Sequence, residues 1–208
     1  MARDLDKLLP VARIWAYPFW FSINRAGLGE VVAEDVDWWA QCIDDPDILA
    51  LDQYSRFAYL CSKLSEFRTL VHYRMLSAPL PLRLVLRAVY KQSTTLKFSV
   101  GRIGPGLYIE HGMGTLVGAE SIGSHCWISQ QVTVGYNAKG RPTLGDRVRV
   151  GPGAVVVGPI TIHDGATVGP NATVIRDVGP GETVASPVAT PLVRRPPRDG
   201  DGSASASV

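Results

Sequence analysis

An aliphatic residue returns at every sixth position through the second half of the chain, and a small or apolar residue follows four places after it. From Leu144 to Val178 the two series run without a break. The first series is Leu144, Val150, Val156, Ile162, Val168 and Val174, and the second is Val148, Ala154, Ile160, Ala166, Ala172 and Val178. Upstream the pairs are Ile103/Leu107, Ile109/Met113, Ile122/Cys126 and Ile128/Val132. A register break around residues 115–120 predicts a bulge or a small insertion at one corner.

A period of six fits neither an α-helix nor an alternating strand, and short fixed periods are typical of stacked solenoids. Each repeat supplies one short flat face with its aliphatic residue inward, glycine-containing corners turn the chain, and three faces close one coil. An ordinary β-sandwich with glycine-rich turns does not place aliphatic residues at sixes through more than four successive repeats. The pattern therefore predicts a parallel β-helix of hexapeptide repeats.

The first half of the chain shows helical periodicity from Val36 to Tyr90. Asp45 is a candidate N-cap and Pro46 suits the first turn of a helix. Before this region, residues 1 to about 35 are expected to form a loosely structured entry segment, because Pro10 and Pro18 limit helix length. The predicted fold class is thus α+β, with helices preceding the solenoid.

Three segments follow from these patterns. Residues 1–95 are predicted to form a helical N-terminal domain, and residues 96–190 the β-helix domain. Residues 191–208 are rich in Pro, Arg, Asp, Gly and Ser, so we expect a disordered tail.

Composition limits the class of protein, its partners and its expected cellular location. A chain of 208 residues with 46% hydrophobic and 19% charged residues is typical of a soluble globular protein. The lysines and arginines form no run, which argues against nucleic acid as a partner. Cys42, Cys61 and Cys126 contain no CxxC pair, which favours reduced thiols and a cytoplasmic location. The aromatic stretch 11–21 is too short to span a bilayer, and a packing surface is favoured over membrane contact.

His111 is the first candidate for chemistry, because the flanking glycines of residues 106–114 leave its ring uncrowded. A neutral imidazole suits proton removal at neutral pH. The alternative is an exposed histidine with a structural role, and spacing alone favours that alternative.

The sequence around His111 resembles that of a known enzyme family. The run Glu-His-Gly-Met-Gly-Thr from Glu110, followed by Cys-Trp-Ile-Ser-Gln-Gln-Val-Thr-Val-Gly from Cys126, is similar to the serine acetyltransferases. The resemblance continues through residues 140–146 and 151–154 to about Pro191. These enzymes belong to the left-handed β-helix acyltransferases, so the resemblance implies a left-handed solenoid.

The resemblance implies an acetyl-CoA-dependent O-acetyltransferase. His111 matches the family's catalytic general base, which deprotonates the acceptor hydroxyl, and Glu110 matches an acidic residue that contacts the acceptor. Lys139 belongs to a small basic group with Arg147 and Arg149, which either meets the phosphates of CoA or is simply solvated. The candidate cofactor-binding residues are Gly135, Tyr136, Lys139, Pro152 and Gly153.

Two departures from the family pattern concern the orientation of the base and the binding of the acceptor. The family has an aspartate about fifteen residues before the base, where residues 96–99 offer no carboxylate, so Glu110 or a backbone carbonyl is left to orient His111. The family's second histidine aligns with Arg141, which can bind a carboxylate or phosphate. The expected acceptor is therefore serine, a serine-like amino acid or a sugar.

Two other functions compete with this one. A catalytically silent solenoid that serves as an assembly or regulatory subunit fits the two departures. A zinc hydratase needs three converging histidines, and the spacing of His111, His125 and His163 does not match that requirement. We predict no metal. The resemblance also implies a homotrimer or a dimer of trimers with acetyl-CoA bound between two chains.

Overall fold

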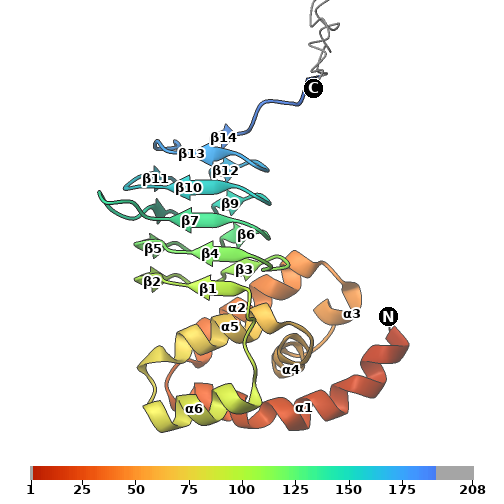
Figure 1. The fold of residues 1–208 in the computed structure, drawn as a ribbon. Coiled ribbons are helices and arrows are strands. Elements are labelled where there is room, and N and C mark those ends of the chain that lie inside the picture. Colours follow the sequence, from red (N-terminus) through yellow and green to blue (C-terminus); the bar gives the residue numbers. More distant parts are fainter. Residues whose placement is uncertain (1, 191–208) are drawn as a thin grey trace, which may run out of the picture.

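The computed structural model describes residues 2–190, with side chains from residue 8 onward. A group of helices is followed by a tall three-sided solenoid of parallel strands (Figure 1). The predicted order of helices and then a parallel β-helix is confirmed. The last helix ends at Val89 and the first strand begins at Leu96. The predicted tail, residues 191–208, lies outside the described residues.

The helical half begins with a correction to the sequence analysis. Its elements are α1 (Ala2–Arg25), α2 (Gly29–Ile43), α3 (Pro46–Leu49), α4 (Gln53–Lys63), α5 (Ser65–Arg74), the 3-10 helix η1 (Met75–Ser77) and α6 (Leu80–Val89). The prediction of a loosely structured entry segment was wrong, because α1 continues through both Pro10 and Pro18.

Packing explains why α1 tolerates its prolines. Its buried residues recur at helical spacing: Ala12, Ala16, Phe19 and Ile23. Phe19 stacks on Tyr90 with ring centroids 4.6 Å apart and meets Phe57 edge-on at 6.2 Å. An interior proline costs about 3 kcal/mol, while each large apolar side chain buried contributes about 1.5–3 kcal/mol. The packing of this face against the other helices therefore outweighs the local preference.

The predicted helix start at Asp45 is confirmed, but the helix is short. The Asp47 amide donates to Asp45 Oδ1 at 2.9 Å, and α3 ends at Leu49. A second cap, Asp52, then accepts from the Ser55 amide at 3.0 Å and begins α4. The apolar stripe that follows Asp45 in sequence therefore belongs mainly to a separate helix.

The solenoid has three parallel sheets, which we call A, B and C. Sheet A contains β1 (Leu96–Phe98), β4 (Thr115–Val117), β7 (Thr133–Gly135), β10 (Val155–Val157) and β13 (Thr173–Val174). Sheet B contains β2 (Arg102–Ile103), β5 (Ser121–Ile122), β8 (Thr143–Leu144) and β11 (Thr161–Ile162). Sheet C contains β3 (Tyr108–Ile109), β6 (Trp127–Ile128), β9 (Arg149–Val150), β12 (Thr167–Val168) and β14 (Thr183–Val184). The chain visits A, B and C in turn, so each coil has three faces.

The aliphatic residues of the repeat form the solenoid core, with one exception. Both series from Leu144 to Val178 are buried. Met113, which the pattern places inside, is 62% exposed, so its assignment was wrong. The strand pairing shows why. Ile109 pairs with Ile128, and Leu116 pairs with Thr133. The first coil therefore uses seven residues to cover a distance that the next coil covers with five, which is an insertion of two residues. The insertion thus lies just before the predicted break, at the corner that carries His111.

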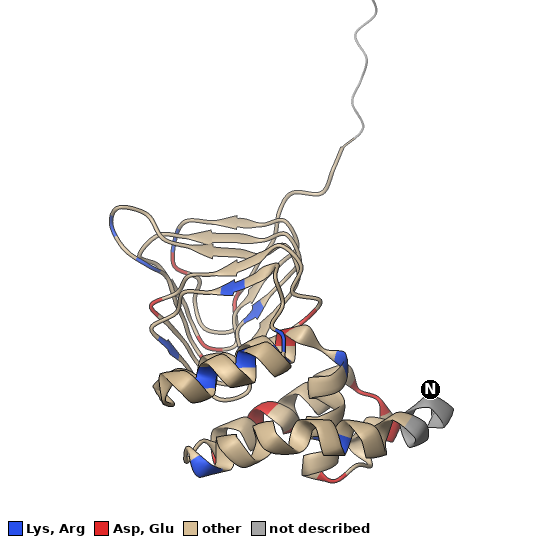
Figure 2. Ribbon diagram, turned by 60° about the horizontal axis from the view of Figure 1, so that its bottom comes forward, with Lys and Arg blue, Asp and Glu red and all other residues tan. Residues whose placement is uncertain are grey.

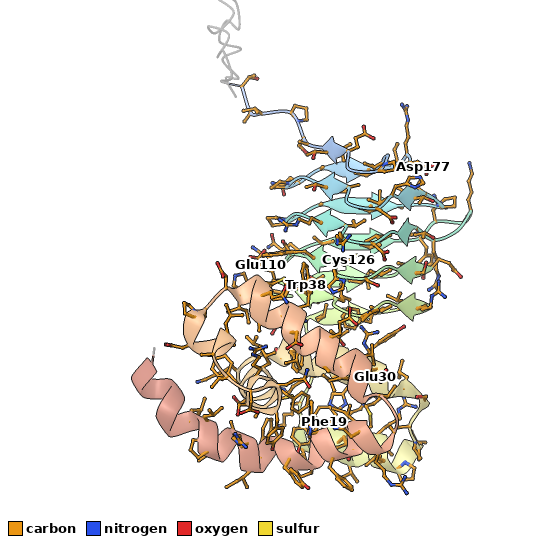
Figure 3. All side chains as sticks on the ribbon, turned by 180° about the vertical axis from the view of Figure 1, so that it is seen from behind. Phe19, Glu30, Trp38, Glu110, Cys126 and Asp177 are labelled. Atoms are coloured by element: carbon orange, nitrogen blue, oxygen red, sulfur yellow. The ribbon has the colours of Figure 1, made fainter. Side chains whose placement is uncertain are left out.

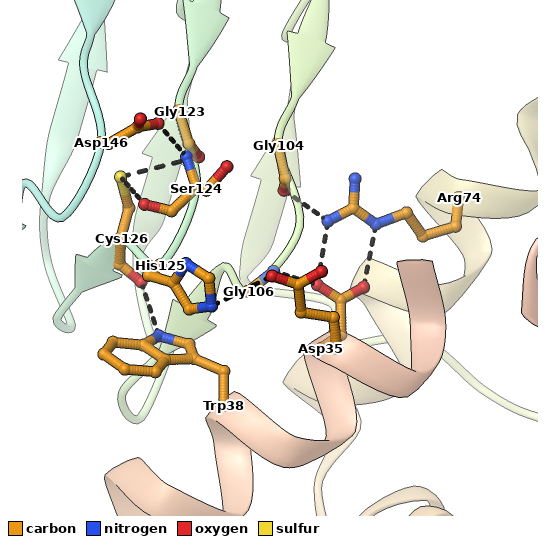
Figure 4. Close-up of polar contacts among 11 residues, drawn as sticks. Asp35, Trp38, Arg74, Gly104, Gly106, Gly123, Ser124, His125, Cys126 and Asp146 are labelled. Carbon is orange, nitrogen blue, oxygen red and sulfur yellow. Dashed lines mark hydrogen bonds and ion pairs between the residues drawn. The ribbon is translucent and has the colours of Figure 1, made fainter. Parts of the chain in front are cut away.

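Helix α2 joins the two halves. Its Trp39 Nε1 donates to the Leu107 carbonyl at 2.7 Å, and Trp38 Nε1 donates to the Cys126 carbonyl at 3.3 Å (Figure 4). The first two coils are therefore fixed to the helices by directional bonds from two indole rings. Within residues 2–190, no helix has both the length and the apolarity needed to cross a membrane.

Candidate active site

His111 lies at a corner between sheet C and sheet A, after β3 and before β4. Its side chain is exposed, and its φ of 59° places the backbone in the left-handed region. Gly112 and Gly114 share this region, with φ of 24° and 63°. His125 and Asn171 adopt the same conformation at other corners, so it reflects how the solenoid turns. The two-residue insertion widens this corner and leaves the imidazole free to meet a ligand.

Glu110 is held by the coil above it. Its Oε2 accepts a hydrogen bond from Ser129 Oγ at 2.9 Å and another from Trp127 Nε1 at 3.2 Å. Figure 3 shows Glu110 close to the helical half, while Asp177 lies at the other end of the solenoid. Among the described hydrogen bonds, none joins Glu110 to the imidazole of His111. The neighbouring coil therefore fixes the Glu110 carboxylate. The hydrogen bonds that this carboxylate accepts do not orient His111, the candidate base.

Glu110 and His111 border a pocket of about 570 Å³ between the helices and the first coil. Helix α2 contributes Trp39, Cys42 and Ile43 to it; the remaining lining residues are Ile48, Tyr59, Leu64, Glu66, Tyr108, Ile109 and Met113. Its volume falls within the range of small-molecule sites, about 300–1,000 Å³. The sequence analysis missed the helical wall of this pocket, because periodicity does not show which helix meets which corner.

Two titratable groups in the pocket stay protonated at neutral pH. Burial, together with the nearby Glu110 carboxylate, raises the pKa of Tyr108 to about 12. Burial likewise raises the pKa of the Cys42 thiol to about 12. Because a thiolate rather than a thiol is the nucleophile, Cys42 is not suited to covalent catalysis here.

Pro152 and Gly153 lie on the same edge of the prism as His111, at the corner between β9 and β10. Gly153 has a φ of 70°, and a Cβ there would lie 2.2 Å from Asn171 Oδ1, so a larger residue would have to displace the Asn171 side chain. Its amide donates to the Gln130 carbonyl at 3.1 Å. The Gly153 N–H is therefore already used in a hydrogen bond within the solenoid.

Gly135, Tyr136, Lys139 and Arg141 lie on the opposite edge of sheet A, where β7 leads into the long loop before β8 (Figures 1 and 2). Tyr136 is 64% exposed, and the Arg141 guanidinium lies 5.2 Å from the centre of its ring. Arg141 Nη1 also donates to the Ser99 carbonyl at 2.8 Å. A single chain therefore brings His111 and Glu110 together but keeps Arg141 and Tyr136 across sheet A from them.

The basic group considered in the sequence analysis is spread over the prism. Lys139 belongs to the long loop, Arg147 to the corner between sheets B and C, and Arg149 to sheet C. Arg149 lies over the ring of Trp127, with 5.4 Å between its guanidinium carbon and the ring centre. The three residues thus lie in the loop between sheets A and B, at the corner between sheets B and C, and on the face of sheet C.

The remaining histidines have local partners or lie at corners. His125 Nε2 is 3.2 Å from Glu34 Oε1, and His72 Nε2 is 2.7 Å from the Tyr90 carbonyl. His163 is exposed at a corner. Over residues 2–190, no three His, Cys, Asp or Glu side chains come together in an arrangement that could hold a metal ion.

The sequence of the solenoid is similar to that of known proteins. Residues 141–176 match the family described as bacterial transferase hexapeptide (six repeats). Over its repeats the chain is similar to the serine acetyltransferases. It is 40% identical over 98 residues to the serine acetyltransferase of Helicobacter pylori, covering 45% of this chain and 57% of that enzyme. It is 38% identical over 87 residues to that of Mycobacterium tuberculosis, covering 39% of this chain and 38% of that enzyme. The chain thus spans just over half of the first relative and less of the second.

Solved structures extend the likeness into the helical half. The serine acetyltransferase of Neisseria gonorrhoeae, in complex with serine, superposes with a TM-score of 0.59 at 26% identity, over 82% of this chain and 74% of that one. The soybean enzyme complexed with serine gives a TM-score of 0.59 at 26% identity, over 80% and 70% of the two chains. The resemblance seen in the sequence is confirmed, and it includes the arrangement of helices before the solenoid.

Proposed function

We propose that the protein is an acetyl-CoA-dependent O-acetyltransferase that acts on the hydroxyl group of a small polar acceptor. The observation that carries this proposal is the position of His111 and Glu110, adjacent on one widened corner and bordering a pocket of about 570 Å³. The related serine acetyltransferases support the reaction type, and two of them are solved with serine bound. Acetyl-CoA is the co-substrate, and no metal takes part.

The chemistry needs one base and no covalent enzyme intermediate. The imidazole of His111 removes the proton of the acceptor hydroxyl, and the oxygen attacks the thioester carbon of acetyl-CoA. A C–O bond forms, the C–S bond breaks, and the departing CoA sulfur takes up a proton. Glu110 binds the acceptor, and Ser129 and Trp127 hold its carboxylate in place. A carboxylate fixed before the acceptor arrives reduces the entropy cost of positioning that acceptor.

We infer that each complete site is shared by two chains. His111 lies on one edge of sheet A, and Arg141 and Tyr136 lie on the other. In a trimer of prisms with cyclic symmetry, one edge of each chain can face the opposite edge of its neighbour. Arg141 of the neighbour would then bind an acidic group of the acceptor. Gly135, Tyr136, Lys139, Pro152 and Gly153 would line the groove for acetyl-CoA.

The same proposal assigns a separate role to each of the two predicted domains. A helical domain over residues 1–95 would close the acceptor pocket, and the β-helix domain over residues 96–190 would carry the base and the cofactor groove. We place the enzyme in the cytoplasm, where acetyl-CoA is available.

A second function, a catalytically silent solenoid, is favoured by two observations. Residues 96–99 hold no carboxylate to orient the base, and the described hydrogen bonds include none made by the His111 ring. Such a protein would serve as an assembly or regulatory subunit and would release no CoA.

The test is acetyl-CoA consumption, followed as release of free thiol, with serine, homoserine, related amino acids and nucleotide-linked sugars as acceptors. The proposal predicts acceptor-dependent release and an acetyl ester on the acceptor, identified by mass spectrometry. No release with any acceptor, together with no measurable CoA binding, would favour the silent solenoid.

A further inference from the structure

Glu66 brings a second carboxylate to the pocket that Glu110 and His111 border. It lies in the first turn of α5, so the helical half supplies it. A Cβ placed on Gly112 would lie 2.6 Å from Glu66 Cγ, which shows how closely this side chain approaches the His111 corner. Among the described residues, only Ser65 donates a hydrogen bond to the Glu66 carboxylate, from its Oγ at 3.2 Å. The side chain thus reaches the corner with most of its hydrogen-bonding capacity unused.

Acidic side chains line the pocket, and the guanidinium of Arg149 lies outside the lining, over the ring of Trp127. Glu66 and Glu110 are both in its lining, and the lining contains no lysine or arginine. Both recorded side-chain bonds to Glu110 are accepted by Oε2, which leaves Oε1 for a ligand. Two carboxylates beside one cavity attract a cation and hold a protonated amine in its charged form.

Much of the remaining lining of the pocket is apolar. Ile43, Ile48 and Leu64 line it together with the ring of Trp39. Serine has no apolar side chain to cover this lining, whereas a branched or aromatic substituent would bury against it. Each such side chain gains about 1.5–3 kcal/mol on full burial, which corresponds to more than a tenfold change in affinity.

We propose that the acceptor is a hydroxylated amine that carries an apolar substituent, with its ammonium group bound between Glu66 and Glu110. This inference rests on the proposed acetyltransferase activity and names the class of acceptor. The acceptor oxygen attacks the thioester after His111 takes its proton, a C–O bond forms, the C–S bond breaks, and CoA leaves as the thiol. The ammonium keeps its proton between the two carboxylates, so its nitrogen has no lone pair and the product is an ester rather than an amide.

The test compares acceptors in pairs by the kcat/KM of thiol release from the full chain. None of the three acceptors carries the acidic group that Arg141 would bind, so that contact is the same in all of them. Leucinol carries both the cation and the apolar group, 2-aminoethanol lacks the apolar group, and N-acetylleucinol lacks the cation. We expect leucinol to exceed each of the other two by at least about tenfold. We also expect Glu66→Gln to lower kcat/KM for leucinol by at least about tenfold, through KM, and to leave the KM for acetyl-CoA unchanged.

A matched control separates a local effect from a general change of charge. Glu30 is exposed in the first turn of α2 and lies outside the pocket lining, so Glu30→Gln should leave the kcat/KM of all three acceptors unchanged. Equal kcat/KM for leucinol, 2-aminoethanol and N-acetylleucinol, with no effect of Glu66→Gln, would overturn this inference. Transfer to serine that is lost in His111→Ala would in that case still support the acetyltransferase. Absence of transfer to any acceptor would overturn both.

Discussion

Arg74 and Asp35 form a buried ion pair with two parallel hydrogen bonds, from Nε to Oδ2 and from Nη2 to Oδ1, each 2.9 Å long (Figure 4). The two side chains are 6% and 0% exposed. Arg74 Nη2 also donates to the Gly104 carbonyl at 2.7 Å, and the Gly106 amide donates to Asp35 Oδ1 at 2.8 Å. The pair therefore connects α5, α2 and the first coil, and it fixes the helices against the solenoid.

Replacing Arg74 with methionine should destabilise the fold strongly, because Asp35 would remain as a buried charge without its partner. Breaking one side of such a pair costs about 3–5 kcal/mol. The control, Arg13→Met, breaks a pair whose side chains are 46% and 61% exposed, and exposed pairs contribute about 1 kcal/mol or less. Urea unfolding measures both losses. Similar losses in the two variants would show that the buried pair does not stabilise the junction.

The Ser129 hydroxyl should matter for turnover rather than for folding. Ser129→Ala removes the shorter of the two bonds that hold Glu110, and a hydrogen bond to a charged group contributes about 1.5–3 kcal/mol. We expect kcat/KM for the acceptor to fall by at least about tenfold, with little change in the KM for acetyl-CoA. The same fall in Ser124→Ala, a serine at another corner, would mean that the effect is not specific to Glu110.

Mixed assemblies test whether two chains share one site. His111→Ala and Arg141→Ala should each be weakly active alone, and Arg141→Ala should raise the acceptor KM more than that of acetyl-CoA. After unfolding and refolding together, some sites should combine the intact His111 of one chain with the intact Arg141 of another, so activity should recover in part. Mixing that restores nothing, in assemblies shown by mass to contain both chains, would contradict the shared site.

The stability of the helical half should fall at acidic pH. Burial lowers the pKa of His72, and its neutral ring donates from Nε2 to the Tyr90 carbonyl. The folded protein therefore binds fewer protons than the unfolded chain, so the contribution is present above the ordinary pKa of about 6.5 and is lost as pH falls through the lower folded value. His72→Gln keeps a donor but does not titrate. Its urea midpoint should change less than that of the wild type between about pH 7.5 and about pH 5, and equal changes would exclude His72 as the cause.

How far the sequence predicts the structure depends on the range of the interactions. The solenoid is predictable because each coil packs only on its neighbours, so a local period of six determines what is buried. Helix α1 was mispredicted because Pro10 and Pro18 are local signals, whereas the burial of Phe19 against Tyr90 depends on residues far along the chain. Met113 was misassigned because the two-residue insertion lies just before residues 115–120, where the sequence pattern shows its break, so Met113 still stands at the expected spacing after Ile109.

The candidate site also contains residues that a local motif predicts and residues that only tertiary packing brings together. His111 and Glu110 are adjacent in the sequence and share one corner, so a local motif brings them to attention. Glu66 comes from a helix, and its approach to Gly112 follows from the packing of α5 on the first coil. Arg141 lies across sheet A, and its role depends on a neighbouring chain. The pocket is therefore a tertiary feature that the repeat pattern does not contain.

The most direct test of the account is the turnover of His111→Ala. Free-thiol release from acetyl-CoA is measured with an acceptor that the wild type uses, alongside CoA binding and the urea midpoint. His111 is exposed, so folding and CoA binding should stay intact while turnover falls by about two orders of magnitude or more. Unchanged turnover in a folded variant that binds CoA would contradict the assignment of His111 as the general base.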